Sequence, residues 1–194
     1  VYWLKFDRLG QLDVSDLEAI LATRGSEVAL IALMMVNNET GVITDIGAVT
    51  KVASQYNIPV HCDAVAALGN LAIDFASSGL STMAISGHKV GAPIGVGALI
   101  VGREIKPTSL LHGGSQERAL RSGTLSYPFI SSFAAAVSAA EADRPQRVKR
   151  LAELRDRLET QVLEALPAAV STVSGVQRTS HHAHMIFPGA QSDN

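Results

Sequence analysis

The sequence contains little of what several classes of protein require. A single cysteine among 194 residues excludes a disulfide framework and is typical of a reducing compartment, so we expect a cytoplasmic protein. Sixteen basic and eighteen acidic residues give a net charge of −2, which leaves no positive excess to bind a nucleic acid or an anionic membrane. The longest apolar run, residues 28–36, is far shorter than the ~20 residues that span a bilayer. We therefore expect neither nucleic acid nor membrane among its partners.

Charged residues and metal-ligating patterns are also scarce. Charged residues make up 18% of the chain against about 25% in a typical soluble domain, while apolar residues reach 47%. This composition excludes a disordered chain and indicates that an unusually large share of the surface is buried, in a core or against a partner. His181, His182 and His184 lie close together but lack the spacing of zinc ligands, so we predict no metal site.

Strand-like and helix-like segments alternate at short intervals in the first part of the chain. A capping box formed by Ser15 and Glu18 predicts one helix start, and Asp45 before the apolar stripe of 46–56 predicts another. Continuous apolar runs such as 28–36 are typical of strands buried on both faces. The expected strands are 28–36, 59–62, 82–85 and 97–101. This alternation predicts an α/β fold with a mostly parallel sheet and helices on both faces.

The pattern changes after residue 131. An alanine-rich helix is expected over 133–142, and Pro145 is expected to begin a second, amphipathic helix, because proline suits the first helical turn. Strand-like segments at 170–173 and 183–187 indicate a second, small sheet. We therefore place a boundary near residues 141–145, which divides the chain into 1–142 and 143–194.

The residues most suited to chemistry follow the expected strand 82–85. Ligands of open parallel sheets bind at the carboxyl ends of the strands, and Ser86, His88 and Lys89 lie at that end. A lysine among apolar strands loses its proton readily because desolvation lowers its pKa, and its neutral amine can form a Schiff base with an aldehyde. Ser86, His88 and neighbouring backbone amides are suitable phosphate donors. The alternative is a polar turn with an exposed lysine.

Two further strand ends carry polar side chains. Asp63 ends the strand before it, and a carboxylate near a Schiff-base lysine is what the pyridinium nitrogen of pyridoxal phosphate requires. Asn37 and Asn38 follow 28–36, where an amide can donate to the phenolic oxygen of the same ring. Taken singly, Asp63 could cap a helix and the asparagines could form an ordinary turn. Because the three strand ends offer complementary groups, we expect a site for pyridoxal phosphate.

With these residues the sequence resembles the class V aminotransferase family of pyridoxal-phosphate enzymes, and within it the cysteine desulfurases. The segments that carry the resemblance are 37–41, 61–65, 86–89 with the glycines up to 97, 113–117 and 121–124. Their order and spacing match along roughly the whole chain. The resemblance implies the fold type I of pyridoxal-phosphate-dependent transferases, with 1–142 as the second half of the large domain and 143–194 as the start of a small α+β subdomain. The chain is accordingly expected to be a central fragment, inactive by itself.

The resemblance also assigns roles to single residues. Lys89 would be the catalytic lysine that forms the Schiff base, and Asp63 would pair with the ring nitrogen. Asn38 would lie near the phenolic oxygen, and Ser86 and His88 would hold the phosphate. A sixth residue, Thr124, would reach the phosphate of the cofactor in the other subunit of a homodimer.

The activity implied by the resemblance is removal of sulfur from L-cysteine. The products would be L-alanine and an enzyme persulfide used for iron–sulfur or thiolated cofactor synthesis, with a sulfur-acceptor protein as a further partner. Other class V activities remain as alternatives: a selenocysteine lyase, an aminotransferase or a kynureninase-like hydrolase. A non-catalytic interaction subunit that keeps the fold is the alternative of another class.

The sequence departs from the family pattern in three respects. Ala66 stands where many desulfurases have a glutamine near the phenolic oxygen, and Ala92 stands where glycine is usual. The only cysteine, Cys62, adjoins Asp63 in a strand, so the two side chains point to opposite faces and Cys62 is expected in the core. The persulfide cysteine and the arginine for the substrate carboxylate are expected beyond Asn194.

Overall fold

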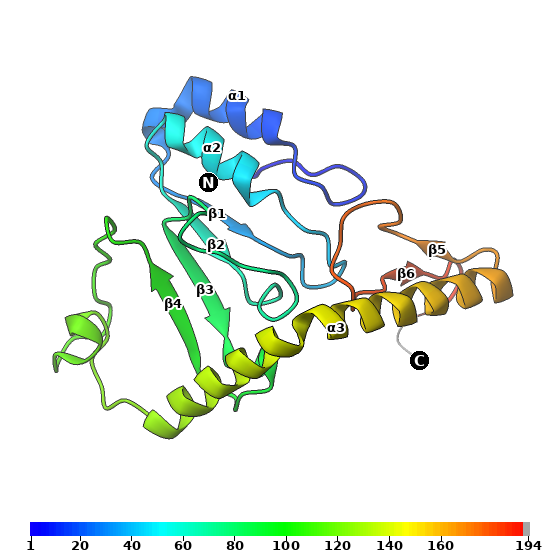
Figure 1. Cartoon of the computed structure of the whole chain (residues 1–194). Helices are drawn as coiled ribbons and strands as arrows, with labels where there is room; N and C mark the ends of the chain where they lie inside the picture. The colour runs from blue at the N-terminus through cyan, green and yellow to red at the C-terminus, as the bar shows by residue number, and fades with distance from the viewer. Residues whose placement is uncertain (192–194) are drawn as a thin grey trace.

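A four-stranded sheet forms the centre of the chain, whose computed structural model describes residues 1–191 (Figure 1). The strands are β1 (Ile31–Met34), β2 (Val60–Asp63), β3 (Thr82–Ser86) and β4 (Gly97–Val101), in that spatial order. The first three run parallel, and β4 is antiparallel to β3. The mostly parallel sheet that the sequence predicts is thereby confirmed.

The strand expected over 28–36 is shorter than predicted and is buried mainly on one side. Its regular part, β1, alternates from the buried Ile31 to the exposed Ala32. The chain enters β1 from a short 3-10 helix, η1 (Gly25–Glu27), so residues 28–30 complete the turn instead of pairing as a strand. Periodicity alone could not show this, because a run of apolar residues looks the same whether or not both faces are covered.

Two helices, α1 (Val14–Arg24) and α2 (Ile46–Gln55), pack side by side over the sheet (Figure 1). Val49, Val52 and Ala53 of α2 are buried, at the spacing that places them on one face of the helix. They join Leu17 and Leu21 of α1 in the main core. At β2 the same core contains Val60 and Cys62.

The caps of these helices agree with the sequence in one case and differ in the other. The Asp45 carboxylate accepts from the Ala48 amide at 2.9 Å, as predicted for α2. In α1 the cap is Asp13, whose Oδ1 accepts from the Ser15 amide at 3.0 Å. The prediction of Ser15 as the cap is therefore wrong. The helix begins two residues earlier, and Asp13 has the extended backbone that a capping residue requires.

One uninterrupted helix, α3 (Tyr127–Ala165), replaces the two helices expected on either side of Pro145. A proline inside a helix removes one backbone hydrogen bond and costs about 3 kcal/mol. Here an alanine-rich segment precedes Pro145 and a segment rich in leucine and arginine follows it, and both favour the helix. Arg147 also donates to the Ala140 carbonyl at 3.1 Å across this stretch. The helix therefore passes through the predicted boundary between 1–142 and 143–194, and that boundary stays a prediction.

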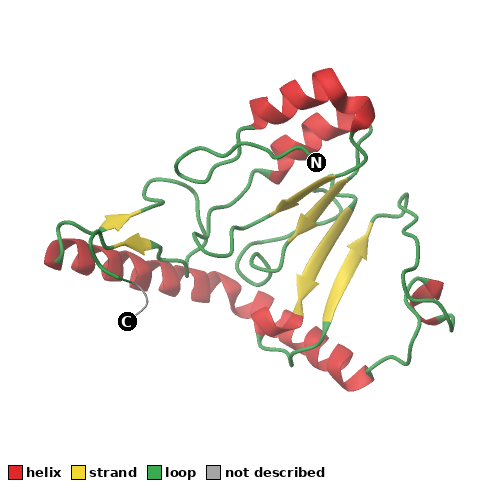
Figure 2. Cartoon of the chain, turned by 180° about the vertical axis from the view of Figure 1, so that it is seen from behind, coloured by secondary structure: helices red, strands yellow, loops and turns green. Residues whose placement is uncertain are grey.

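The C-terminal part of the chain forms the small second sheet that the sequence predicts. It consists of β5 (Val170–Ser171) and β6 (Met185–Ile186), which pair antiparallel, and Figure 2 shows them beside the C-terminal half of α3. No helix in the described part of the chain is both long and apolar enough to cross a membrane.

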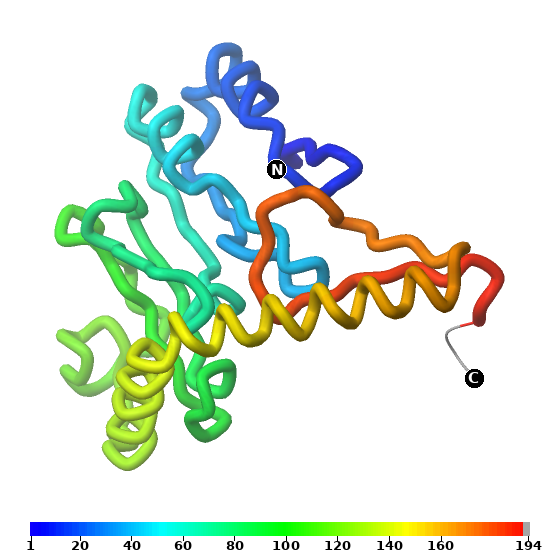
Figure 3. Tube along the Cα trace, turned by 45° about the vertical axis from the view of Figure 1, so that its right-hand side comes forward, coloured from blue at the N-terminus to red at the C-terminus, as the bar shows by residue number. Residues whose placement is uncertain are grey.

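Between β5 and β6 lies a stretch, residues 177–182, that we call the joining segment. It returns to the loop after β1, as Figure 3 shows, where Arg178 and Val42 form an antiparallel bridge. The Ile43 amide donates to the Gln177 carbonyl at 3.1 Å, and the Thr179 amide donates to the Gly41 carbonyl at 2.9 Å. Two parts of the chain that are far apart in sequence are therefore joined by backbone hydrogen bonds.

An ion pair attaches the joining segment to α3. The Arg178 guanidinium donates two hydrogen bonds to the Glu159 carboxylate, at 2.7 and 2.5 Å, and only 9% and 12% of the two side chains is exposed. Bidentate pairs of this kind are specific in geometry as well as strong. Removal of either partner leaves a buried charge without compensation.

We expect Glu159→Gln to release the joining segment, because an unpaired buried guanidinium costs about 3 kcal/mol. In the full-length protein, hydrogen exchange at the Thr179 and Ile43 amides should become roughly 100-fold faster. Glu153→Gln is the control, since that carboxylate is exposed on the same helix and its loss should leave the joining segment unchanged. Equal protection of both amides in the Glu159→Gln variant and the wild type would contradict the anchoring role.

Candidate functional site

The three strand ends singled out by the sequence lie along one edge of the sheet. In the parallel register Met34 of β1 lies beside Asp63, and Asp63 lies beside Ala84 of β3. Asn38 follows β1 by four residues, and Ser86 is the last residue of β3. The expected convergence of these segments is therefore observed at the level of the backbone.

Ser86, His88 and Lys89 lie on one tight turn. The turn is the 3-10 helix η2 (Gly87–Val90), which directly follows β3. The Ser86 hydroxyl and the His88 Nδ1 are 2.8 Å apart, so a hydroxyl and an imidazole act as neighbouring polar groups that suit an anion. Lys89 is exposed, whereas the sequence predicted a lysine enclosed among apolar strands.

Gly87 allows this turn to lie close to the chain that follows it. A Cβ at this position would lie 2.9 Å from a methyl carbon of Val96 and 3.0 Å from the Cβ of Ala92. Any other residue would therefore push η2 away from the β3–β4 connection. The glycine of the motif keeps His88 and Lys89 at the end of β3.

Asp63 is half-buried at the end of β2 and has one oxygen available. Its Oδ1 accepts from the Val65 amide at 2.9 Å, which stabilises the turn out of the strand. The other carboxylate oxygen accepts no hydrogen bond from residues 1–191. The turn and a ligand therefore do not compete for the same atom.

Cys62 lies on the opposite face, as the alternation of side chains predicts. Its side chain is fully buried, and burial together with the neighbouring Asp63 raises the pKa of the thiol to about 12. The expectation of a core cysteine is confirmed. A thiol of this kind is protonated and inaccessible at neutral pH, so it is a poor nucleophile.

The two asparagines after β1 have different tasks. Asn37 forms the turn itself, because its Oδ1 accepts from the Glu39 and Thr40 amides at 3.0 and 2.9 Å. The Asn38 side chain is exposed and has no hydrogen bond within residues 1–191. Asn37 is thus fixed in the turn through its amide oxygen, whereas neither atom of the Asn38 amide is engaged, and the role predicted for Asn38 stays a prediction.

Thr124 is not brought to this edge. It lies in the exposed loop between the 3-10 helix η3 (Gln116–Ala119) and α3, which Figure 1 shows on the β4 side of the sheet. The loop is held by its own hydrogen bonds, such as Ser122 to the His112 carbonyl at 2.9 Å. Its predicted role at a second subunit stays a prediction.

A groove of about 730 Å³ next to Lys89 contains groups that sequence reasoning missed. It lies between η2 and α3 and includes Lys89, Asn70, Asp143, Arg147 and His181. In the sequence, His181 stands out only as a possible metal ligand, and no group of His, Cys, Asp and Glu in residues 1–191 is arranged to hold a metal ion. No local signal could have found it, because only the return of the joining segment brings His181 near Lys89.

The groove is electrostatically unfavourable for a charged histidine. Burial, together with repulsion from His182, Arg147 and Lys89, lowers the pKa of His181 from 6.5 to about 4. Burial also lowers the pKa of His182, with smaller contributions from Lys89 and Arg178. Both imidazoles are therefore neutral at pH 7.

Comparison with known proteins gives a match over nearly the whole chain. The family model described as "Aminotransferase class-V" matches residues 1–191. The chain belongs to this family. The resemblance inferred from the sequence is thereby confirmed.

Relatives within the class V family are named as desulfurases. An "IscS-like cysteine desulfurase" of Mycobacterium tuberculosis (strain ATCC 25618 / H37Rv) is 37% identical over 194 residues, which is all of this chain and 49% of that protein. A human "Cysteine desulfurase" is 33% identical over 172 residues, or 88% of this chain and 37% of that protein. The chain thus spans about half the length, or less, of these curated relatives.

A solved structure confirms the fold class. The "X-ray structure of NifS-like protein from Rickettsia africae ESF-5" superposes with a TM-score of 0.92 at 29% identity, covering 96% of this chain and 52% of that one. The chain therefore has the fold type I of the pyridoxal-phosphate-dependent transferases, as predicted.

We expect the stability of the folded protein to fall as the pH is lowered from 6.5 towards 4. The unfolded chain binds protons at His181 and His182 in this range while the folded chain does not, so acid favours unfolding. The melting temperature of the full-length protein, measured between pH 7 and 4, gives the slope of stability against pH.

The His181→Gln variant should show a shallower slope than the wild type, since glutamine does not titrate. His112→Gln is the matched control, because His112 lies in a loop that does not line this groove. An unchanged slope in His181→Gln would show that this histidine is not kept neutral by folding.

Proposed function

We propose that this chain supplies the cofactor-binding edge and the catalytic lysine of a pyridoxal-phosphate-dependent cysteine desulfurase. The observation that carries the proposal is the parallel register of Met34, Asp63 and Ala84, which aligns three strand ends bearing an amide, a carboxylate and a lysine. The names of the relatives favour L-cysteine as the substrate over the other class V activities.

The residues at this edge fit pyridoxal phosphate by their chemistry. The cofactor presents an aldehyde, a ring nitrogen, a phenolic oxygen and a phosphate. The described residues offer a matching amine at Lys89, a carboxylate oxygen at Asp63, a free amide at Asn38 and the Ser86–His88 pair. When bound, the cofactor acts as an electron sink for the substrate.

Each side chain has a distinct task in this scheme. The Lys89 amine would hold the cofactor through its aldehyde and carry a proton to and from the substrate carbon. The Asp63 carboxylate would keep a proton on the ring nitrogen, and its bond to Val65 holds it in orientation. Ser86 and His88 would bind the phosphate, while Asn38 would donate to the phenolic oxygen.

Sulfur transfer requires a second nucleophile that Cys62 cannot provide, because its thiol is buried and protonated. In the net reaction L-cysteine and a protein thiol would give L-alanine and a protein persulfide, so the sulfur atom moves without any outside oxidant. We place the accepting cysteine outside residues 1–194. A sulfur-acceptor protein would then receive the persulfide sulfur.

Exposed apolar side chains support a homodimer in which Thr124 reaches the other subunit's cofactor. Leu110 is 90% exposed, Ile94 is 85% exposed, and Tyr127, three residues after Thr124, is 69% exposed. Side chains of this size remain uncovered mainly where a partner packs. A cytoplasmic location, as the single cysteine indicates, completes the proposal.

Lys89→Ala should abolish the yellow absorption band that full-length protein shows after addition of pyridoxal phosphate, because the amine that binds the aldehyde is gone. Lys51→Ala, on the exposed side of α2, serves as the control and should keep the band. A band that survives Lys89→Ala, or that never forms in the wild type, rules out the cofactor assignment.

Asp63→Asn should reduce the rate of alanine formation from L-cysteine by about 10²-fold, the usual effect of removing one charged stabilising group. Asparagine keeps an oxygen that accepts from Val65, so the turn is preserved. Asp74→Asn is matched to it, since Asp74 makes the same kind of turn with the Ala76 amide at 3.0 Å, away from the site. Equal rates in the two variants would refute the role of Asp63.

A further inference from the structure

We propose that His182 is a positioning residue that holds the Asn38 turn (residues 37–41) against the joining segment, and thereby sets the orientation of the Asn38 amide. The inference rests on the proposed function, in which that amide binds the cofactor. His182 itself would touch neither cofactor nor substrate; it acts through Asn38.

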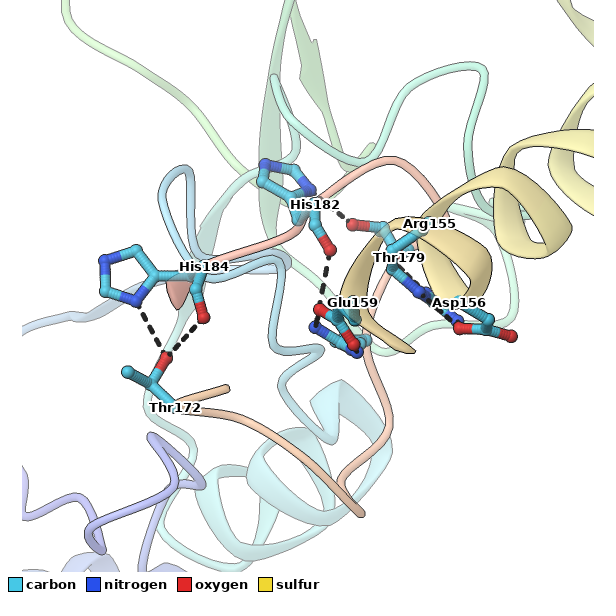
Figure 4. Close-up of polar contacts among 8 residues, drawn as sticks. Arg155, Asp156, Glu159, Thr172, Thr179, His182 and His184 are labelled. Atoms are coloured by element: carbon cyan, nitrogen blue, oxygen red, sulfur yellow. Dashed lines mark hydrogen bonds and ion pairs between the residues drawn. The ribbon is translucent and has the colours of Figure 1, made fainter. Parts of the chain in front are cut away.

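Both nitrogens of the His182 ring are engaged. Its Nε2 lies 3.2 Å from the Asn38 carbonyl oxygen, and its Nδ1 lies 2.6 Å from the Thr179 hydroxyl, the latter drawn in Figure 4. A carbonyl can only accept, so Nε2 carries the proton and Nδ1 accepts from Thr179. The ring therefore connects the joining segment to the backbone of the turn in one defined tautomer.

The ring also occupies the space beside Gly41. A Cβ on Gly41 would lie 2.5 Å from the Cβ of His182 and 2.7 Å from its Nδ1. Gly41 has φ +76, a conformation that favours glycine. The His182 ring can therefore occupy this position only because residue 41 is a glycine, which also gives the turn its shape.

His182 is itself held on a rigid support. Thr179, its hydrogen-bond partner, donates from its amide to the Gly41 carbonyl, and its own carbonyl accepts from Arg155 of α3 at 3.0 Å. Arg178 adds the buried pair with Glu159 on the same helix. Figure 4 shows Arg155 and Glu159 of α3 close to Thr179. A displacement of the joining segment on α3 is thus transmitted to the turn through His182.

Asn38 depends on this support because it has little of its own. The turn is stabilised by Asn37, while the Asn38 side chain is exposed and makes no hydrogen bond within residues 1–191. Its carbonyl contact with His182 is the tertiary hydrogen bond nearest to the amide that would bind the phenolic oxygen. Loss of that contact frees the peptide plane next to the ligand-binding side chain.

The test compares holoenzyme variants of the full-length protein. His182→Ala should weaken pyridoxal-phosphate binding up to about tenfold, the range for one lost hydrogen bond, and should shift the maximum of the yellow band as Asn38→Ala does. His182→Gln retains a donor for the Asn38 carbonyl and should restore most of both properties. His184→Ala should change neither.

His184 is a matched control because it belongs to the same part of the chain and is also half-buried. Its Nδ1 lies 2.7 Å from the Thr172 hydroxyl, a contact that Figure 4 also shows. This contact does not involve the Asn38 turn. A loss of fold alone should affect both histidine variants. An effect on the turn should affect only His182→Ala.

A double mutant separates positioning from general stability. If His182 acts only through Asn38, the Asn38→Ala/His182→Ala protein should bind the cofactor as weakly as Asn38→Ala alone. Additive losses would overturn the inference, as would unchanged binding and spectrum in His182→Ala. A proton on Nδ1 of wild-type His182 in ¹⁵N NMR would also overturn it, and this measurement needs no variant to fold.

Failure of this inference is distinguishable from failure of the proposed function. If the yellow band depends on Lys89 but does not respond to His182→Ala, the cofactor assignment holds and the positioning role is wrong. If no band depends on Lys89, the proposed function itself fails.

Discussion

The parallel pairing of β1, β2 and β3 is the constraint on which the site depends. Parallel strands end at the same edge, so three segments that are distant in sequence leave the sheet side by side. The α1 and α2 helices bury one face of the sheet and keep these strands in register. Without that register, Asn38, Asp63 and Lys89 would be separate polar turns, each with an ordinary structural explanation.

A second connection links the C-terminal part of the chain to this edge of the sheet. The joining segment leaves the small sheet, pairs with the loop after β1, and is attached to α3 by the Arg178–Glu159 pair. It brings His181 into the groove beside Lys89 and places His182 on the Asn38 turn. The large α/β part and the C-terminal part therefore meet where the polar strand ends lie. A change in how the C-terminal part packs can alter the site without altering any residue that binds a ligand.

Much of this structure could be predicted from local patterns. The apolar runs located every strand of the main sheet, and the Asp45 cap and apolar stripe located α2, because these signals are local. Predictions failed where a long-range or competing effect acted. Pro145 did not end its helix, since strong helix formers flank it, and Asp13 took the capping position expected for Ser15. Strand β1 is shorter than its apolar run because the run includes the turn after η1.

For the site, local sequence was sufficient for the kind and order of the polar groups, and for the face on which Cys62 lies. Those properties follow from residue identity, from strand ends and from the alternation of side chains, which need only neighbouring residues. Other properties of the site could be seen only in the folded chain. They are the hydrogen bonds that engage Asn37 but not the Asn38 side chain, the exposure of Lys89, and the approach of His181 and His182. They depend on how segments far apart in sequence come together, and such contacts exist only once the sheet, α3 and the joining segment have packed together.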